Sequence, residues 1–302
     1  MASKPISPLV SLKPVARAPS RSSVSNVVAG APFSQAAAGP PIEATTQPLT
    51  LAIDIGGSHI KVGVLDAVGH LTRAATPVPT PVTGGPTAVV AAIVTMAQAL
   101  GEFDRVSVGF PGVVRDGRVL TAPNLGTEAW HGFPLGDDLA KRFGKPVRVL
   151  NDASVQGLGV IEGVGLECVI TLGTGFGFAL FENGLLAPHM ELGQHPCTKG
   201  HTYDQYLGEA ALKAVGKTKW NKRLVKAIGF LDTLIVFDVL LIGGGNARHI
   251  TLSLPSNVRT VPNSAGVTGG VRLWYPAMAP AFAKPSLPYR DAPTGITPAP
   301  EA

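Results

Sequence analysis

The sequence predicts an α/β fold in which one structural unit occurs twice, so that two lobes enclose a cleft. Segments of strand length and of helical length alternate between residues 48 and 275. An apolar strand also runs directly into glycines three times, at DIGGS, LGTGFG and LIGGGN. The first two glycine segments open the two halves of the chain, and each precedes another strand. Because a dinucleotide-binding fold places its glycine loop before a helix, the pattern disfavours that fold.

Composition divides the 302 residues into four predicted segments. Residues 1–47 form a disordered tail or transit peptide. Residues 48–160 form an N-terminal lobe that holds the first glycine hairpin and a candidate catalytic aspartate. Residues 161–275 form a C-terminal lobe with the second glycine hairpin, and the segment 276–302, rich in Pro and Ala, is expected to be partly loose.

The tail is rich in Ser, Pro, Ala and Val, and it holds four basic residues against one acid, Glu43. Such a segment buries too little apolar surface to fold alone. An Arg-containing, Ser-rich and acid-poor start is typical of an organelle transit peptide, which predicts a plastid location. The alternative is a disordered bacterial leader on a cytoplasmic protein.

Charge, hydropathy and cysteine content argue against several classes of protein. The tail accounts for +3 of the net charge of +5, so the remainder offers no general surface for nucleic acid. The best candidate for a membrane span, Thr87–Leu100, is shorter than the roughly 18 apolar residues required, so no membrane partner is expected. Cys168 and Cys197 form no disulfide framework and fit a reducing compartment.

Apolar periodicity and turn signals place the elements of the N-terminal half. Asp116-Gly117 is a strong two-residue hairpin signal. The expected elements are, in chain order, strands 51–57, 60–66 and 70–77, helix 87–100, strand 105–112, hairpin 113–121, helix 135–143, strand 147–152 and helix 153–163.

The C-terminal half repeats the cycle. Its expected elements are strands 168–177 and 178–186, helices 202–216 and 220–236, and a strand, a glycine turn and the start of a helix across 238–250.

The stretch LAIDIGGSHIKVGVLD, residues 51–66, combines a hairpin with an unexpected charge. Gly56 and Gly57 suit a tight turn because glycine reaches positive φ without steric cost. Asp54 is a carboxylate at the end of an apolar strand, where burial is costly unless a cation or a cavity mouth is near. A glycine-lined turn also lets backbone N–H groups approach an anion. A hairpin without a binding role would explain the turn but not the carboxylate of Asp54.

Several of these segments resemble a known family of kinases. DIGGSHIK, TLGTGFG and LIGGGNAR resemble the glycine motifs of sugar kinases with the actin-like, ribonuclease-H-like ATPase fold. GFPGVV, TAPNLG, VLNDASVQGLG and ELGQHP lie between them in the order found in ROK kinases. HTYDQYLGEAAL, KWNKR and VPNSAGVTGG are similar to the polyphosphate glucokinase branch. The resemblance spans about residues 51–274. It implies phosphoryl transfer to the 6-hydroxyl of glucose from inorganic polyphosphate, ATP or both.

Asp152, in LNDAS, is the candidate catalytic base. It ends an apolar strand and precedes a helix of small residues. A carboxylate there accepts a proton from a sugar hydroxyl if the two lie within about 3 Å. The alternative is that Asn151 and Asp152 simply cap the helix. The resemblance favours catalysis, because the aspartate of this motif is the family's base.

The resemblance also assigns phosphate-binding and nucleotide-binding residues. It implies that Asp54 holds the Mg²⁺–phosphate assembly, usually through water. The implied phosphate-binding set is Asp54, Gly56, Gly57, Ser58, Lys61, Thr171, Gly173, Thr174 and Gly175. The implied nucleotide-binding set is Gly243, Gly244, Gly245 and Asn246.

Sugar recognition requires polar groups that converge on hydroxyls. The resemblance assigns this role to Asn124, Asn151, Glu191, Gln194 and His195. The usual family pattern is Glu-x-Gly-His, whereas Gln194 stands in the last position here, which leaves the hexose preference open.

Many ROK proteins also bind zinc through one His and three Cys. Only Cys197 lies near this motif, and a structural zinc requires four good ligands, so no zinc is expected.

A one-signed run of charge bears on the phosphate donor. Lys213 to Lys226 contains six basic residues and no acid. A linear polyanion binds a row of cations through counterion release, so the run favours polyphosphate, through a track of Lys217, Lys219, Lys222 and Arg223. The alternative for such a run is the solvated face of a helix.

Two rival functions are a strictly ATP-dependent ROK glucokinase and a non-catalytic ROK-like sugar-binding protein. The second is disfavoured because the candidate base and the glycine hairpins are all present. Residues 1–47 also lack the helical period of a DNA-binding helix-turn-helix. The sequence leaves a homodimer open.

Overall fold

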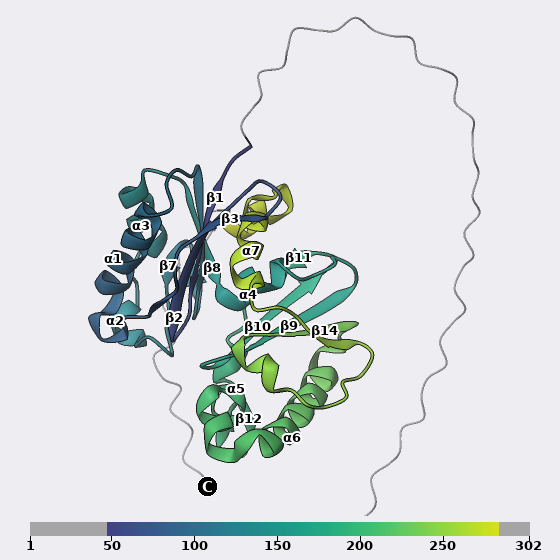
Figure 1. Ribbon diagram of the computed structural model, residues 1–302. Helices are drawn as coiled ribbons and strands as arrows, with labels where there is room; N and C mark the ends of the chain where they lie inside the picture. Colours follow the sequence, from purple (N-terminus) through teal and green to yellow (C-terminus); the bar gives the residue numbers. More distant parts are fainter. Residues whose placement is uncertain (1–46, 284–302) are drawn as a thin grey trace, which may run out of the picture. The chain divides into compact units, whose positions relative to one another are not determined.

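A computed structural model describes residues 47–283 of the chain (Figure 1). Residues 1–46 and 284–302 lie outside the described part, so the tail, its targeting role and the loose C-terminal end stay predictions. Two main β-sheets carry the fold, one built from residues 50–151 and the other from residues 166–260.

The first sheet has the strand order β3-β2-β1-β5-β8, with β4 beside β2. Its strands are β1 Thr50–Ile55, β2 His59–Leu65, β3 Leu71–Ala74, β4 Val78–Pro79, β5 Arg105–Phe110 and β8 Val147–Asn151. β1 pairs antiparallel with β2 and parallel with β5, and β5 pairs parallel with β8. β1 is almost completely buried, as expected of a central strand covered on both faces.

The second sheet repeats this arrangement, in the order β11-β10-β9-β14-β15. Its strands are β9 Leu166–Leu172, β10 Phe176–Glu182, β11 Leu185–Leu186, β14 Val239–Gly243 and β15 Val258–Thr260. β9 pairs antiparallel with β10 and parallel with β14, as β1 does with β2 and β5. The predicted duplication of one unit is therefore confirmed.

Helices cover each sheet and fill the space between the sheets. α1 Gly85–Gln98, α2 Thr127–Trp130 and α3 Leu135–Phe143 pack on the first sheet around Trp130 and Ile93. α5 Tyr203–Leu207 and α6 Glu209–Ile235 pack on the second sheet around Trp220. α4 Asp152–Leu158 contacts strands of both sheets, and it lies between them in Figure 1.

The end of the described chain returns to the first sheet. α7 Ala265–Thr268 and η4 Gly269–Trp274 contact β1 and α4. Val271 packs with Ala52, and the Trp274 indole donates to Ser107 Oγ at 2.8 Å. η5 Pro276–Phe282 follows. The sequence division at residue 275 stays a prediction, although the last elements before it touch the first sheet.

Shorter elements complete the described chain. They are the strands β6 Val114–Arg115, β7 Arg118–Val119, β12 Pro196–Thr198 and β13 His201–Thr202, and the 3₁₀ helices η1 Val82–Gly84, η2 Leu192–Gln194 and η3 Gly245–His249. Asp116 and Gly117 have φ of 52° and 73° between β6 and β7, so the predicted hairpin is confirmed.

Three predicted elements differ from the structure. α4 ends at Leu158 rather than continuing to residue 163. A break at Gly208 divides the expected helix 202–216 between α5 and the start of α6, whereas Gly216, with φ 74° and ψ 161°, interrupts α6 where that helix was expected to end. The third glycine motif leads into a helix as expected, but this is the short 3₁₀ helix η3. None of the helices in residues 47–283 is both long and apolar enough to cross a bilayer.

Candidate active site

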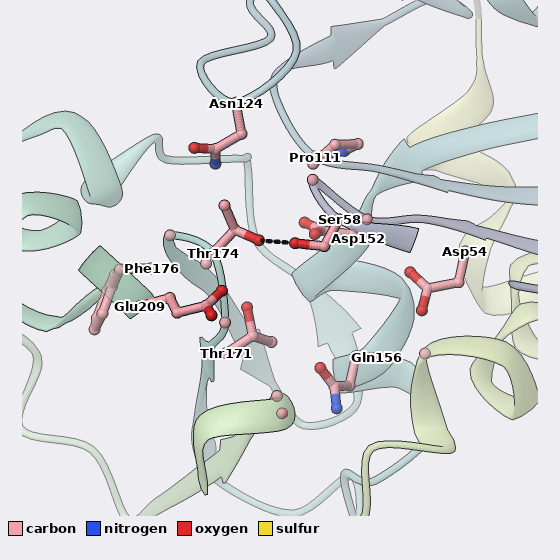
Figure 2. Close-up of a pocket in the computed structure, with 18 of the residues that line it drawn as sticks. Asp54, Ser58, Pro111, Asn124, Asp152, Gln156, Thr171, Thr174, Phe176 and Glu209 are labelled. Atoms are coloured by element: carbon pink, nitrogen blue, oxygen red, sulfur yellow. Dashed lines mark hydrogen bonds between the residues drawn. The ribbon is translucent and has the colours of Figure 1, made fainter. Parts of the chain in front are cut away.

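A cavity of about 440 Å³ gathers most of the predicted site residues from both sheets (Figure 2). It lies where the two glycine hairpins face each other. The predicted residues that line it are Asp54, Gly56, Gly57, Ser58, Lys61, Asn124, Asn151, Asp152, Thr171, Gly173, Thr174, Gly175, Glu191, Gly244, Gly245 and Asn246. The predicted residues that do not line it are Gly243, Gln194, His195, Lys217, Lys219, Lys222 and Arg223.

The first hairpin uses glycine for close approach. Neither Gly56 nor Gly57 has a positive φ, so the expected conformational reason is wrong. A Cβ on Gly56 would lie 2.9 Å from the carbonyl oxygen of His59, and one on Gly57 would lie 3.2 Å from the Thr174 side chain. Thr80 fixes the turn by donating its hydroxyl to the Gly56 carbonyl at 2.7 Å. Gly56 therefore allows the close approach within its own turn, and Gly57 leaves room for the opposite hairpin.

The two hairpins touch through their hydroxyl groups. Ser58 Oγ lies 3.0 Å from Thr174 Oγ1, as the dashed line in Figure 2 shows. Ser58 follows β1 and Thr174 follows β9, so this contact joins turns that belong to different sheets. Hydroxyls from both halves of the chain are thereby brought to one point of the cavity.

Asp54 and Lys61 form an ion pair at the base of the first hairpin. They are directly opposite on β1 and β2, and Lys61 Nζ lies 2.8 Å from Asp54 Oδ2. Asp54 is 13% exposed and Lys61 33% exposed at the side chain. The pair explains how a carboxylate is accommodated at the end of an apolar strand, because its charge is compensated there.

Asp152 lies at the start of α4, and part of its surface faces the cavity. Burial, together with the negative charges of Asp54 and Glu191, raises the pKa of its carboxyl group to about 8, and a backbone hydrogen bond from Ala153 opposes the shift. A carboxyl group with such a pKa exchanges its proton near neutral pH, which is the property required of a general base.

Asn151, rather than Asp152, provides the N-cap of α4. Its side-chain oxygen accepts from the backbone N–H groups of Ala153 and Ser154, at 3.0 and 3.3 Å. Its amide nitrogen donates to the carbonyl oxygens of Phe110 and Gly112. The capping role that was weighed for the Asn-Asp pair thus belongs to Asn151, and Asp152 is left free to face the cavity.

Sequence reasoning missed Asp204, which supports the second hairpin. Asp204 accepts a hydrogen bond from the Phe176 backbone N–H and another from Gln194 Nε2 at 2.7 Å. It also lines the cavity, and burial raises the pKa of its carboxyl group. A Cβ on Gly175 would lie 2.8 Å from its Oδ1. Gln194 therefore acts on the site through Asp204 without lining the cavity.

The third glycine motif is tied to the second hairpin. Asn246 donates its side-chain amide to the Gly173 carbonyl oxygen at 2.9 Å. Gly244 has φ 85°, and a Cβ there would lie 2.3 Å from the Leu172 carbonyl oxygen, so only glycine fits. Arg248, at the end of this motif, also lines the cavity and was not predicted.

The basic run lies on α6 next to this third motif. Lys217, Lys219 and Lys222 are exposed. Asn221 donates to the carbonyl oxygens of Lys217 and His249, at 2.9 and 3.0 Å, which joins the run to η3. Arg223 instead stacks on the Tyr206 ring, 4.7 Å from its centroid, and donates to the Tyr206 carbonyl oxygen.

The donor set suits a magnesium ion held mainly by phosphate oxygens. No group of three His, Cys, Asp or Glu residues within 47–283 is arranged to hold a metal ion. Mg²⁺ needs only one or two protein carboxylates when substrate phosphates and water complete its coordination. Asp54 fits that role because it lines the cavity and Lys61 is paired with only one of its oxygens.

The fold and the cavity together define a class of protein. Two halves, each with an antiparallel glycine hairpin leading to parallel strands, face each other across a cavity that holds both hairpins. This is the architecture of the actin-like, ribonuclease-H-like ATPase fold.

The sequence model of the ROK family matches residues 50–214, and the chain belongs to this family. It is 32% identical over 243 residues to the polyphosphate glucokinase of Mycobacterium tuberculosis, with 75% of this chain and 91% of the relative covered. It is 38% identical over 139 residues to a glucokinase of Streptomyces coelicolor, with 43% and 42% of the two chains covered.

Solved structures agree with this assignment. The inorganic polyphosphate/ATP-glucomannokinase of Arthrobacter sp. strain KM superposes with a TM-score of 0.68 at 30% identity, covering 74% of this chain and 97% of that chain. A ROK family glucokinase from Streptomyces griseus, in complex with glucose and AMPPNP, superposes with a TM-score of 0.62 at 23% identity, covering 74% and 98%. The second similarity supports the fold alone.

Proposed function

We propose that this chain is a glucokinase that transfers a phosphoryl group from inorganic polyphosphate, ATP or both to the 6-hydroxyl of glucose. The observation that carries the proposal is that both glycine hairpins and Asp152 line one cavity, with Ser58 and Thr174 in contact across it. The similarity to the polyphosphate glucokinase and to the polyphosphate/ATP-glucomannokinase supports both the reaction and the choice of donors. Such an enzyme acts in carbohydrate metabolism.

Asp152 is the group that takes the proton from the attacking hydroxyl. Its pKa of about 8 means that the carboxylate form is available near neutral pH and is basic enough to accept that proton. Asn124 and Glu191 line the same cavity and offer an amide and a carboxylate to the other sugar hydroxyls. Asp204, which also lines the cavity, is a further acceptor for a sugar hydroxyl.

The two hairpins position the phosphoryl group. The hydroxyls of Ser58 and Thr174 converge from opposite sheets, and fixed donors of this kind stabilise charge without reorganisation during the reaction. Mg²⁺, held through Asp54, neutralises phosphate charge when bound. Lys61 compensates the charge of Asp54 and adds a cation to the same wall.

Polyphosphate has a basic path away from the cavity. Arg248 lines the cavity, and the next residue, His249, is hydrogen-bonded to Asn221 on α6. Lys217 and Lys219 lie directly after the kink at Gly216, in the first turn of the second helical segment. The N-terminal end of a helix carries a partial positive charge, which the two lysines increase. An anion that binds there is therefore stabilised by the dipole and by the lysines together.

The decisive experiment gives the purified full-length chain glucose with either ATP or long-chain polyphosphate and measures glucose 6-phosphate. The proposal expects turnover with at least one donor and a higher kcat/KM with polyphosphate. Turnover with ATP alone would identify the strictly ATP-dependent glucokinase. Glucose binding without any turnover would identify the non-catalytic sugar-binding protein.

A second experiment tests the basic track. Replacing Lys217, Lys219 and Lys222 by Gln should flatten the salt dependence of the polyphosphate KM by about two units of log–log slope, while the ATP and glucose KM values stay unchanged. The matched control replaces Lys141, Lys145 and Lys199, which are exposed and do not line the cavity. Equal slopes in the two triple variants would contradict a track on α6.

The location of the enzyme is a separate proposal. Residues 1–47 have the acid-poor, Ser-rich composition of a transit peptide, which supports a plastid location. A fluorescent protein fused behind residues 1–47 should accumulate in plastids of plant cells. A cytosolic distribution of that fusion would contradict the proposal.

A further inference from the structure

His189 lies on a wall between the catalytic cavity and a second cavity of about 460 Å³. Its polar lining residues are His189, Asn151, Ser154 and Arg115, and apolar residues of β11 and η5 complete it. Asn151 lines both cavities, whereas Glu191 lines only the catalytic one, so the segment from 189 to 191 separates the two spaces. A side chain in this segment can therefore fix the orientation of a residue in the catalytic cavity without lining that cavity itself.

The imidazole of His189 contacts the carboxylate of Glu191. His189 Nε2 lies 3.5 Å from Glu191 Oε2. Both ring nitrogens of His189 and Oε2 of Glu191 are shielded from solvent, and none of the three forms a hydrogen bond among the described residues. Buried polar atoms are rarely left without a partner. The contact of 3.5 Å between His189 and Glu191 is therefore the polar interaction that these atoms have in the described part of the chain.

The contact leaves one oxygen of Glu191 available. The second carboxylate oxygen, Oε1, is not among the enclosed atoms that lack a partner, and the Glu191 side chain is 27% exposed where it lines the catalytic cavity. Glu191 thus has one oxygen toward His189 and one available to a ligand. Hydrogen bonds of this kind are often long without substrate and shorten when it binds.

We infer that His189 is a positioning residue for sugar recognition, which holds Oε2 of Glu191 so that the other oxygen faces a sugar hydroxyl. The inference rests on the proposed function, since it takes glucose as the ligand of Glu191. The other polar side chains of this segment are placed differently. Gln194 is bonded to Asp204, and His195 is exposed and does not line the catalytic cavity.

The test is a double-mutant cycle between His189 and Glu191. His189→Ala should raise the glucose KM about tenfold, with the donor KM unchanged and kcat altered less than about threefold. In the Glu191→Gln background, His189→Ala should change the glucose KM less than about twofold, because its target is already altered. His189→Gln, in which an amide N–H replaces the imidazole N–H as donor, should recover most of the glucose affinity.

A matched control separates this effect from the loss of any histidine. His70 pairs with Asp66 at 3.1 Å on an exposed part of the chain that does not line the cavity, so His70→Ala should leave all three parameters unchanged. Equal factors for His189→Ala in both backgrounds, or an equal rise in both substrate KM values, would overturn the inference. If the chain binds glucose without turning it over, the proposed function fails. The double-mutant cycle is then read from glucose affinities measured by calorimetry, which still tests the role of His189. If it binds no glucose, both fail.

Discussion

The two glycine hairpins occupy equivalent places in the two sheets but carry opposite chemistry. In the first, the second pair from the turn is Asp54 opposite Lys61, and Asp54 is also paired with Gly109 of the parallel strand. In the second, the equivalent residue is Thr171, which is opposite Gly177 and paired with Gly243. An ion pair in one half therefore corresponds to a neutral hydroxyl over a glycine in the other.

This difference indicates a division of labour within a duplicated fold. The first hairpin supplies the ion pair of Asp54 and Lys61, and the candidate base Asp152 follows the last strand of the same sheet. The second hairpin supplies the hydroxyls of Thr171 and Thr174, and the carboxylate of Asp204 lies behind it, bonded to the backbone N–H of Phe176. Changes in the first hairpin should therefore affect charge, whereas changes in the second should affect positioning.

The largest effect is expected at Asp152. Asp152→Asn removes the proton acceptor but keeps the shape, so kcat should fall by about 10²–10⁴ while glucose binding persists. Turnover rates and calorimetric glucose affinities measure the two parts. Asp137→Asn, on an exposed position of α3, is the matched control and should leave kcat unchanged. A variant at position 152 with more than about a hundredth of the original kcat would contradict the assignment.

The pH dependence of activity should depend on Asp152 and on the nearby charge of Asp54. Because the pKa of Asp152 is about 8 in the unliganded protein, kcat/KM for glucose should rise about tenfold per pH unit below pH 8 and level off above it. Asp54 is the largest charged contributor to this shift, so Asp54→Asn should move the profile to lower pH. Thr171→Val, at the equivalent position of the second hairpin, should lower the rate without shifting the pH profile. Identical profiles for the two variants would remove the distinction between the halves.

The same carboxyl group should affect stability with a definite sign. Its pKa is raised from 3.8 to about 8 on folding, so the folded state holds the proton more tightly than the unfolded state. The stability that this proton provides is lost as the pH rises from about 4 to 8. Asp152→Asn should therefore become progressively more stable than the original protein across that window, as measured by urea denaturation. A constant difference across the window would mean that the carboxyl group is solvated.

The ion pair of the first hairpin gives a smaller effect. Lys61→Met leaves Asp54 largely buried without its cation, and should cost more stability than the double change Asp54→Asn with Lys61→Met, which removes both charges. The expected difference is about 1 kcal/mol, since Lys61 is one-third exposed. Urea denaturation of the three proteins measures it. Equal stability of the single and double variants would show that the pair is solvated.

Local patterns predicted most of the fold, because the responsible forces are local. The alternation of apolar residues placed β1, β2, β9 and β10, and the turn chemistry of Asp116 and Gly117 placed the β6–β7 hairpin. Long-range contacts were not visible in the same way. Nothing near Asp204 in the sequence shows that its carboxylate supports the backbone of Phe176, 28 residues earlier. His189 and Glu191 are only two residues apart, but the sequence does not show that they lie between two cavities.

The glycines show the same limit within a single motif. Gly56 and Gly57 were expected in a hairpin turn because glycine reaches positive φ. They do lie in that turn, but neither has a positive φ. The actual reason at Gly57 is the nearness of Thr174, which lies 117 residues further along the chain. In the third motif the expected strand, turn and helix start are present, but the helix is a short 3₁₀ helix, and Gly244 is required by its close approach to Leu172.

The smallest expected effect tests whether the two hairpins act together. Ser58→Ala and Thr174→Val each remove one hydroxyl from a contact of 3.0 Å, and a hydrogen bond of this kind contributes about 0.5–1.5 kcal/mol. Because both substitutions break the same contact, the double variant should raise the donor KM by less than the product of the single effects. A product of independent factors would mean that each hydroxyl binds phosphate separately. In that case the halves would be linked by the shared substrate, and the contact between Ser58 and Thr174 would not contribute to donor binding.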